Sequence, residues 1–126
     1  EEELDEIHYL KTGKLIEACV MCVCLIKKNI DDPTTEKLIE FSNKFGLAFQ
    51  IRDDILDEVG DETKIGKPIK SDIKNNKSTY PSIIGIEKSQ KKAELLIDKA
   101  LGILNELPFK TDKLEFLCEL VIKRKN

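Results

Sequence analysis

Hydrophobic residues recur along this 126-residue chain at helical intervals from one end to the other. Spacings of three and four residues place these side chains on one face of an α-helix, where they can pack against a neighbouring element. No segment has the alternation of apolar and polar residues between turn signals that indicates a β-strand. The pattern therefore predicts an all-α fold of helices packed roughly antiparallel.

The first half of the chain divides into three predicted helices. The first is expected to falter at "KTG", residues 11–13, because a β-branched residue followed by glycine holds a helix poorly. The second, over residues 14–27, is nearly all apolar, which predicts burial on most of its sides. Asp32 and Pro33 form a start signal for the third, which should continue for about 27 residues, more than twice the usual helix length, to near Gly60.

The second half begins with a long polar segment and continues in helices. The segment over residues 60–79 contains two glycines, a proline and five lysines, and a connection of this length in a compact domain is usually functional or disordered. Thr79 is expected to cap a short helix that has Pro81 in its first turn. A longer helix should follow, and Asp112, with Glu115 three residues on, can open the last one.

Composition and charge describe an ordinary soluble domain. Hydrophobic residues make up 40% of the chain and charged residues 36%, and the net charge is only -3, so no global field favours nucleic acid. The longest apolar stretch, residues 15–26, contains Glu17 and is shorter than the roughly 20 residues that cross a bilayer, so no membrane anchor is expected. The first residues contain no initiator Met and no secretion signal, which suggests a piece of a longer polypeptide.

Four cysteines, Cys19, Cys22, Cys24 and Cys118, are interpreted mainly as small buried hydrophobic residues. A zinc site needs four convergent ligands, usually at paired spacings, and only His8 accompanies the first three cysteines. Metal ligands, disulfides and reactive thiols remain the alternatives. Unpaired cysteines fit a reducing compartment, which predicts a cytoplasmic protein.

The stretch "QIRDDILDEVGD", residues 50–61, gathers carboxylates on one predicted helix. At about 100° of rotation per residue, Gln50, Asp53, Asp54 and Asp57 fall within an arc of about 100°. The Asp-Asp-x-x-Asp spacing suits Mg²⁺, an ion that is usually held by one or two carboxylates together with substrate phosphates. A merely solvated acidic face is the alternative, because like-charge pairs on a helix cost only a few tenths of a kcal/mol.

Four motifs, taken in their order along the chain, resemble one enzyme family. They are "YLKTGKLIEA" (9–18), "FGLAFQIRDDILDEVGD" (45–61), "IGKPIKSD" (65–72) and "KSTYPSIIG" (77–85). Together they are similar to the C-terminal part of the trans-isoprenyl diphosphate synthases, the polyprenyl synthetase family, and above all to its short-chain bacterial type. The resemblance implies an isoprenoid-synthase-type helical bundle, in which residues 1–126 form only the C-terminal part of a single domain.

The resemblance also implies an activity. This is a Mg²⁺-dependent prenyl transfer that joins isopentenyl diphosphate to an allylic diphosphate, dimethylallyl or geranyl, with farnesyl diphosphate as the expected product. In that scheme Asp53 is the direct Mg²⁺ ligand, while Asp54 and Asp57 bind the ion or orient its water. Lys11 and Lys67 pair with the allylic diphosphate.

Thr12 and Gln50 resemble family residues that lie beside the nascent carbocation. A faltering helix frees backbone carbonyls, and carbonyl and amide oxygens can solvate a cation. The alternative is that residues 12 and 13 only mark a kink and that Gln50 lies on the surface. Arg124 is implied more weakly, as part of a basic end over isopentenyl diphosphate, since basic residues also favour a helix C-terminus through its dipole.

One expected element is missing, because the family holds its metal ions between two facing aspartate clusters and this chain has only the later one. The chain is therefore predicted to be inactive alone and to belong to a homodimeric parent. A non-catalytic regulatory or assembly module and a related terpene cyclase are the alternatives. The apolar positions that would need partners are Leu15, Ile16, Val20, Val23, Leu25 and Ile26.

Overall fold

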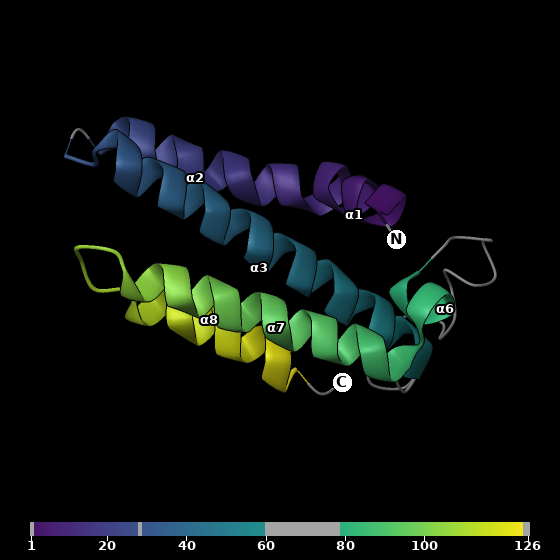
Figure 1. The fold of residues 1–126 in the computed structure, drawn as a ribbon. Coiled ribbons are helices and arrows are strands. Elements are labelled where there is room, and N and C mark those ends of the chain that lie inside the picture. Colours follow the sequence, from purple (N-terminus) through teal and green to yellow (C-terminus); the bar gives the residue numbers. More distant parts are fainter. Residues whose placement is uncertain (1, 28, 60–78, 125–126) are drawn as a thin grey trace.

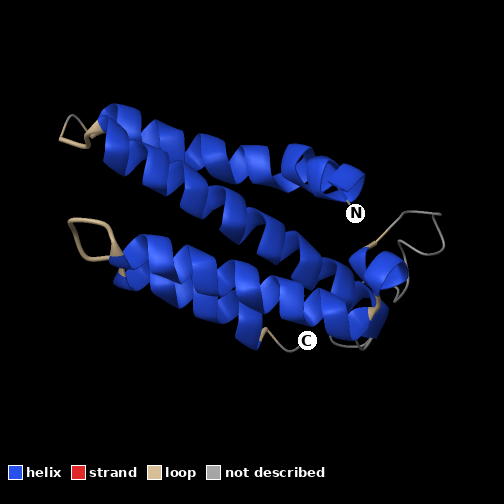
Figure 2. Ribbon diagram, in the orientation of Figure 1, coloured by secondary structure: helices blue, strands red, loops and turns tan. Residues whose placement is uncertain are grey.

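The computed structural model describes residues 2–27, 29–59 and 79–124, and all regular structure in these ranges is helical (Figure 2). The elements are α1 (Glu2–His8), the π-helix η1 (Tyr9–Gly13), α2 (Lys14–Ile26), α3 (Asp32–Val59), α6 (Tyr80–Ile84), α7 (Ile86–Asn105) and α8 (Asp112–Lys123). The all-α prediction is confirmed. The predicted diphosphate ligand Lys67 and the motif around it lie outside the described residues.

The central helix of the bundle is α3, which contacts every other described element. The rod formed by α1, η1 and α2 runs along one side of α3, α7 runs along the other side, and α8 packs on α7 (Figure 1). Successive long helices run in opposite directions, as the sequence predicts. The π-helix therefore lies directly on the helix that carries the acidic cluster.

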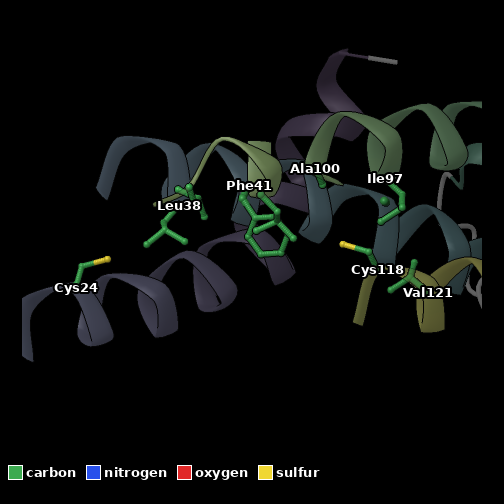
Figure 3. Packing of buried hydrophobic residues seen from close by; sticks show 10 residues of the cluster. Cys24, Leu38, Phe41, Ile97, Ala100, Cys118 and Val121 are labelled. Carbon is green, nitrogen blue, oxygen red and sulfur yellow. The ribbon is translucent and has the colours of Figure 1, made fainter. Parts of the chain in front are cut away.

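The larger apolar cluster joins α3, α7 and α8 with one residue of α2 and one residue of the segment between α7 and α8 (Figure 3). Its buried members are Cys24, Leu38, Phe41, Ala48, Ile97, Ala100, Leu104, Leu107, Cys118 and Val121. Ala48 and Ala100 are fully buried, and such small side chains let the backbones of α3 and α7 approach closely.

A smaller apolar cluster ties α1, α3, α6 and α7 together. Its buried members are Leu4, Ile51, Ile55, Tyr80 and Ala93. Ile51 and Ile55 bracket Asp53 and Asp54 along α3, and both are almost completely buried. This cluster therefore fixes the acidic stretch in the bundle.

The central helix begins one residue before the predicted position. Asp31, not Asp32, caps α3, because its Oδ1 accepts a hydrogen bond from the Thr34 N–H at 2.9 Å. Pro33 then becomes the second helical residue, where its missing N–H still needs no partner. The last helix, α8, begins at Asp112 as predicted, and Thr111 occupies its cap position.

The predicted cap at Thr79 is confirmed. Its side chain accepts a hydrogen bond from the Ser82 N–H at 3.3 Å, and Ser82 Oγ accepts one from the Thr79 N–H at 3.0 Å. This reciprocal pair satisfies two N–H groups at the start of α6. It also fixes the next backbone N–H, that of Tyr80.

The burial predicted for α2 is wrong for this chain. Only Cys24 of this helix is buried, and Leu25 and Ile26 are 76% and 79% exposed. Cys19 and Cys22 are exposed as well, whereas Cys118 is buried as predicted. The cause is that α3 is the main neighbour of α2 within the described residues, so most of the apolar circumference of α2 has no cover.

Candidate functional site

The predicted break at residues 11–13 is present as a π-helix rather than a loop. The Lys14 N–H donates to the carbonyl of Tyr9, five residues back, where an α-helix would use the residue four back. Such π-turns inside helices occur frequently at functional sites. This one carries Lys11, whose side chain is exposed, and Thr12, which is half-buried.

Side chains on one flank of the π-helix hold its geometry. The Tyr9 hydroxyl donates to the Glu17 carboxylate at 2.6 Å, and Lys14 Nζ donates to the same group at 2.9 Å. These two partners, the Tyr9 hydroxyl first, hold the pKa of Glu17 below its ordinary value. Gly13 leaves room for the Tyr9 ring, because a Cβ at Gly13 would lie 2.9 Å from Tyr9 Cδ2.

The π-helix crosses α3 at a pair of glycines. A Cβ added to Gly46 would lie 3.2 Å from the Cα of Gly13 and 3.4 Å from Cδ1 of Ile16. The first of these distances is shorter than most real Cβ contacts, and the second is at the lower limit of ordinary contact. The two backbones therefore approach so closely that polar side chains next to the crossing can bond directly across it.

Thr12 and Gln50 are brought together across this crossing. The Thr12 hydroxyl donates to Gln50 Oε1 at 2.8 Å, and Gln50 Nε2 donates to Asp54 Oδ1 at 3.3 Å. Gln50 is 3% exposed, so it is not the surface residue of the alternative interpretation. The two residues that the resemblance places beside a carbocation are thus direct neighbours.

Asp54 is the centre of a buried hydrogen-bond network. It is 3% exposed, and its Oδ2 accepts from the Tyr80 backbone N–H at 3.2 Å and from His8 Nε2 at 2.9 Å. The rings of His8 and Tyr80 lie 5.4 Å apart. One carboxylate therefore joins α1, α3 and α6, and through Gln50 it also reaches the π-helix.

The three aspartates of the "DDILD" motif differ in their surroundings. Asp53 is partly exposed, and its carboxylate forms no hydrogen bond or ion pair with any other described residue. Asp54 is saturated by internal donors, and Asp57 is buried and also partnered. Asp53 is consequently the acid whose carboxylate is open to an external ligand.

The end of α8 is tied to α3. Arg52 Nη2 donates to the backbone carbonyl of Arg124 at 3.1 Å, and the Arg124 guanidinium carbon lies 6.0 Å from the centre of the Phe49 ring. Phe49 is the residue before Gln50. The structure thus brings the predicted basic end next to the stretch of α3 that carries Gln50 and Asp53.

An apolar pocket of about 430 Å³ opens beside these residues, between the π-helix and the start of α2, the middle of α3, and α8. Among the described residues that line it, Thr12 and Arg124 are the polar ones. These residues are Thr12, Ile16, Phe45, Phe49, Leu117, Leu120, Val121 and Arg124. Such a pocket suits a hydrocarbon group that carries a polar or charged end.

The donor set fits a metal ion that is shared with a phosphate. Within the described residues, no group of three or more His, Cys, Asp or Glu side chains could form a metal site of its own. Mg²⁺ does not need such a cage, because one or two carboxylates and the oxygens of a bound phosphate normally complete its shell. The open carboxylate of Asp53 meets that requirement.

Among known structures, the bundle matches the isoprenoid synthase fold. Geranylgeranyl pyrophosphate synthetase from Pyrococcus horikoshii superposes with a TM-score of 0.76 at 27% identity, over 91% of this chain and 46% of that protein. The model of the polyprenyl synthetase family matches residues 1–118. The chain belongs to the polyprenyl synthetase family, whose members are prenyltransferases of isoprenoid biosynthesis and generally depend on Mg²⁺.

Curated relatives cover nearly all of this chain. Farnesyl diphosphate synthase from Bacillus subtilis (strain 168) is 42% identical over 98% of the chain, and geranylgeranyl diphosphate synthase from Cyanophora paradoxa is 38% identical over 99%. The chain spans 41% of the length of each of these relatives. The resemblance inferred from the four motifs is confirmed at the level of the family.

None of the helices in the described ranges combines the length and the apolar character that are needed to cross a bilayer.

Proposed function

We propose that this chain is the C-terminal part of a trans-prenyltransferase that condenses isopentenyl diphosphate with dimethylallyl or geranyl diphosphate. One observation supports this above the others: Thr12 and Gln50 are hydrogen-bonded across a helix crossing, with the open carboxylate of Asp53 near them on α3 and an apolar pocket beside them. Ionisation of an allylic diphosphate requires groups of these three kinds. A carboxylate holds the metal ion that binds the leaving group, neutral oxygens stabilise the cation, and an apolar pocket takes the hydrocarbon.

The reaction itself breaks one bond and forms another. The allylic carbon–oxygen bond breaks and the diphosphate leaves with the electron pair. The double bond of isopentenyl diphosphate then attacks the allylic cation and a carbon–carbon bond forms. The released diphosphate takes up a proton from the adduct, and the electrons of that C–H bond form the new double bond. Negative charge accumulates on the leaving diphosphate, and preorganised cationic groups at that point lower the barrier most.

Several residues of this chain have separate roles in stabilising the leaving diphosphate. Lys11, exposed on the π-helix, pairs with the leaving diphosphate, and Lys67 joins it from the neighbouring segment. Mg²⁺, held by Asp53 with the diphosphate oxygens, would supply the remaining positive charge. Asp57 would help to hold the water of that ion, while Asp54 contributes from within the bundle by fixing Gln50.

Oxygen atoms near the helix crossing serve the cation. Thr12 Oγ1 and Gln50 Oε1 share one hydrogen and leave lone pairs that can face developing positive charge. Neutral oxygens stabilise the cation and are weaker nucleophiles than carboxylates. Arg124 lines the pocket, its backbone carbonyl accepts a hydrogen bond from Arg52, and its guanidinium is proposed to pair with isopentenyl diphosphate.

The proposal extends to the parent protein. Farnesyl diphosphate is the proposed product, because relatives with this activity in their names align over nearly the whole chain. The parent is proposed to be a cytoplasmic homodimer in which the exposed side of α2 is covered. This chain alone is proposed to be inactive, because it carries one aspartate-rich cluster and the ion needs a second.

Replacing Asp53 in the full-length parent tests the function. Asp53→Asn keeps the size of the side chain but removes its charge, so kcat with dimethylallyl and isopentenyl diphosphates should fall about 100-fold, the usual effect of removing one such electrostatic group. Saturation by Mg²⁺ should also need a higher concentration. Asp98→Asn, an exposed aspartate on α7, is the matched control and should retain wild-type turnover.

Each result has a clear meaning. Normal turnover and Mg²⁺ dependence in Asp53→Asn would contradict the role of this carboxylate. A wild-type parent without prenyl transfer would point to a non-catalytic module. A C20 rather than a C15 chain, identified by mass spectrometry of the product, would replace farnesyl by geranylgeranyl diphosphate.

A further inference from the structure

His8 is a buried polar residue that the proposed chemistry does not use. Its side chain is 5% exposed, and Nε2 donates to Asp54 at 2.9 Å. Its Nδ1 is buried and has no hydrogen-bond partner among the described residues. The whole polar function of this imidazole is therefore exerted through the single bond to Asp54.

The hydrogen bond of His8 matters because the residues around it are apolar. Leu4, Ile51 and Ile55 form the apolar cluster at this point, and burying a polar ring there is unfavourable unless it is hydrogen-bonded. An apolar side chain would fill the same space without this penalty. Packing alone therefore does not explain a histidine at this position, whereas its hydrogen bond to Asp54 does.

Two hydrogen bonds connect the first helical rod to α3, one from His8 to Asp54 and one from Thr12 to Gln50. They are joined on α3, because Gln50 Nε2 donates to Asp54 Oδ1 at 3.3 Å. We call these three bonds the ladder, and the first two are its rungs. On the opposite side, His8 and Thr12 bracket the first turn of the π-helix, with Lys11 between them in sequence.

A network of this kind favours one register of the two helices. Any shift would break several hydrogen bonds at once in a low-dielectric interior, where each bond is worth more than in water. Removal of the His8 rung would take away one of the three donors that bond Asp54, the others being the Tyr80 N–H and the Gln50 amide. Gln50 and, through it, Thr12 would then lose the support that keeps them in place.

We propose that His8 is a positioning residue of the prenyl transfer, which acts through Asp54 and Gln50 to hold Thr12 and the π-helix in the reactive arrangement. This inference rests on the proposed function. His8 touches neither substrate nor metal in this scheme. Its effect is on the geometry of groups that do, where a displacement of about 1 Å can reduce the rate about 100-fold.

Three variants of the full-length parent test the role. His8→Leu fills the space but removes the donor, so kcat should fall about 10- to 100-fold while KM for isopentenyl diphosphate changes less than about twofold. His8→Gln places an amide N–H at nearly the reach of Nε2 and should recover most of the lost kcat. His8→Asn is too short to reach Asp54 and should resemble His8→Leu.

Asp5→Asn is the matched control. Asp5 accepts hydrogen bonds from Lys92 at 3.2 Å, so this variant weakens another polar contact of α1 without touching the ladder. Its kcat should stay within about twofold of wild type. Thermal unfolding midpoints of all variants separate a loss of positioning from a loss of fold.

The outcomes separate the two proposals. Wild-type kcat in a folded His8→Leu would overturn the role of His8 and leave the proposed function intact. If His8→Leu does not fold, the comparison of His8→Gln with His8→Asn decides, and equal kcat values in these two variants would overturn the role. A wild-type parent without prenyl transfer would overturn the proposed function and the positioning role together.

Discussion

Gly46 offers a direct test of the helix crossing on which the candidate site is built. A Cβ at this position would lie 3.2 Å from the Cα of Gly13, so an alanine must push the π-helix away from α3. Alanine gains about 1 kcal/mol over glycine inside a helix. Overpacking against backbone typically costs about 1–3 kcal/mol. We expect Gly46→Ala to lower the free energy of unfolding by about 1 kcal/mol, the balance of these two effects.

Gly102 provides the control for this substitution. It lies inside α7, and a Cβ there would meet no heavy atom within 4 Å. Gly102→Ala should therefore show only the helical gain and raise the free energy of unfolding by up to about 1 kcal/mol. Urea unfolding of the 126-residue chain, followed by circular dichroism, measures both variants. Equal stabilisation by the two alanines would refute the close crossing of η1 and α3.

Two further predictions concern titratable groups. Burial raises the pKa of the Cys118 thiol to about 11, so iodoacetamide at about pH 8 should alkylate Cys19 and Cys22 of the folded chain and leave Cys118 unmodified, as peptide mass spectrometry can show. Protection of Cys19 and Cys22 in the parent would support a covered α2, and equally rapid alkylation of Cys118 in the folded chain would contradict its burial. The Thr34 hydroxyl and N–H hold the pKa of Asp31 below its ordinary value of 3.8, so the cap stabilises α3 fully above that pH and less as the pH falls through the folded pKa. Asp31→Asn keeps a capping side chain without the charge, so its urea midpoint should fall less than that of wild type between about pH 4 and about pH 2, and parallel pH profiles would argue against this cap.

The helices could be predicted from the sequence because local patterns determine them. Apolar spacing gives the faces, and the threonine and proline near residue 80 mark the start of α6. The environment of α2 could not be predicted in the same way. An apolar circumference indicates that a helix needs cover, but it does not say whether the covering element belongs to the same chain. Most of α2 is accordingly exposed within the described residues.

The site was partly predictable, for a different reason. The family resemblance points to Thr12 and Gln50, and the structure places Thr12 Oγ1 and Gln50 Oε1 2.8 Å apart. The sequence pattern links His8 only to the cysteines, although this residue lies one turn before Thr12. A helical wheel is a poor guide at this point, because the π-turn inserts an extra residue and rotates the side chains that come after it.

The aspartates of "DDILD" differ in their surroundings, and this difference reduces the repulsion between them. Successive residues of a helix differ by about 100°, so Asp53 and Asp54 cannot face the same way. Asp54 turns into the bundle, where the His8 imidazole, the Tyr80 N–H and the Gln50 amide satisfy it. Asp53 has no such donors among the described residues, and its charge remains available to a cation. Identical side chains in one motif thus acquire different roles from the partners that the fold supplies, and those partners are what the variants at positions 8 and 53 would separate.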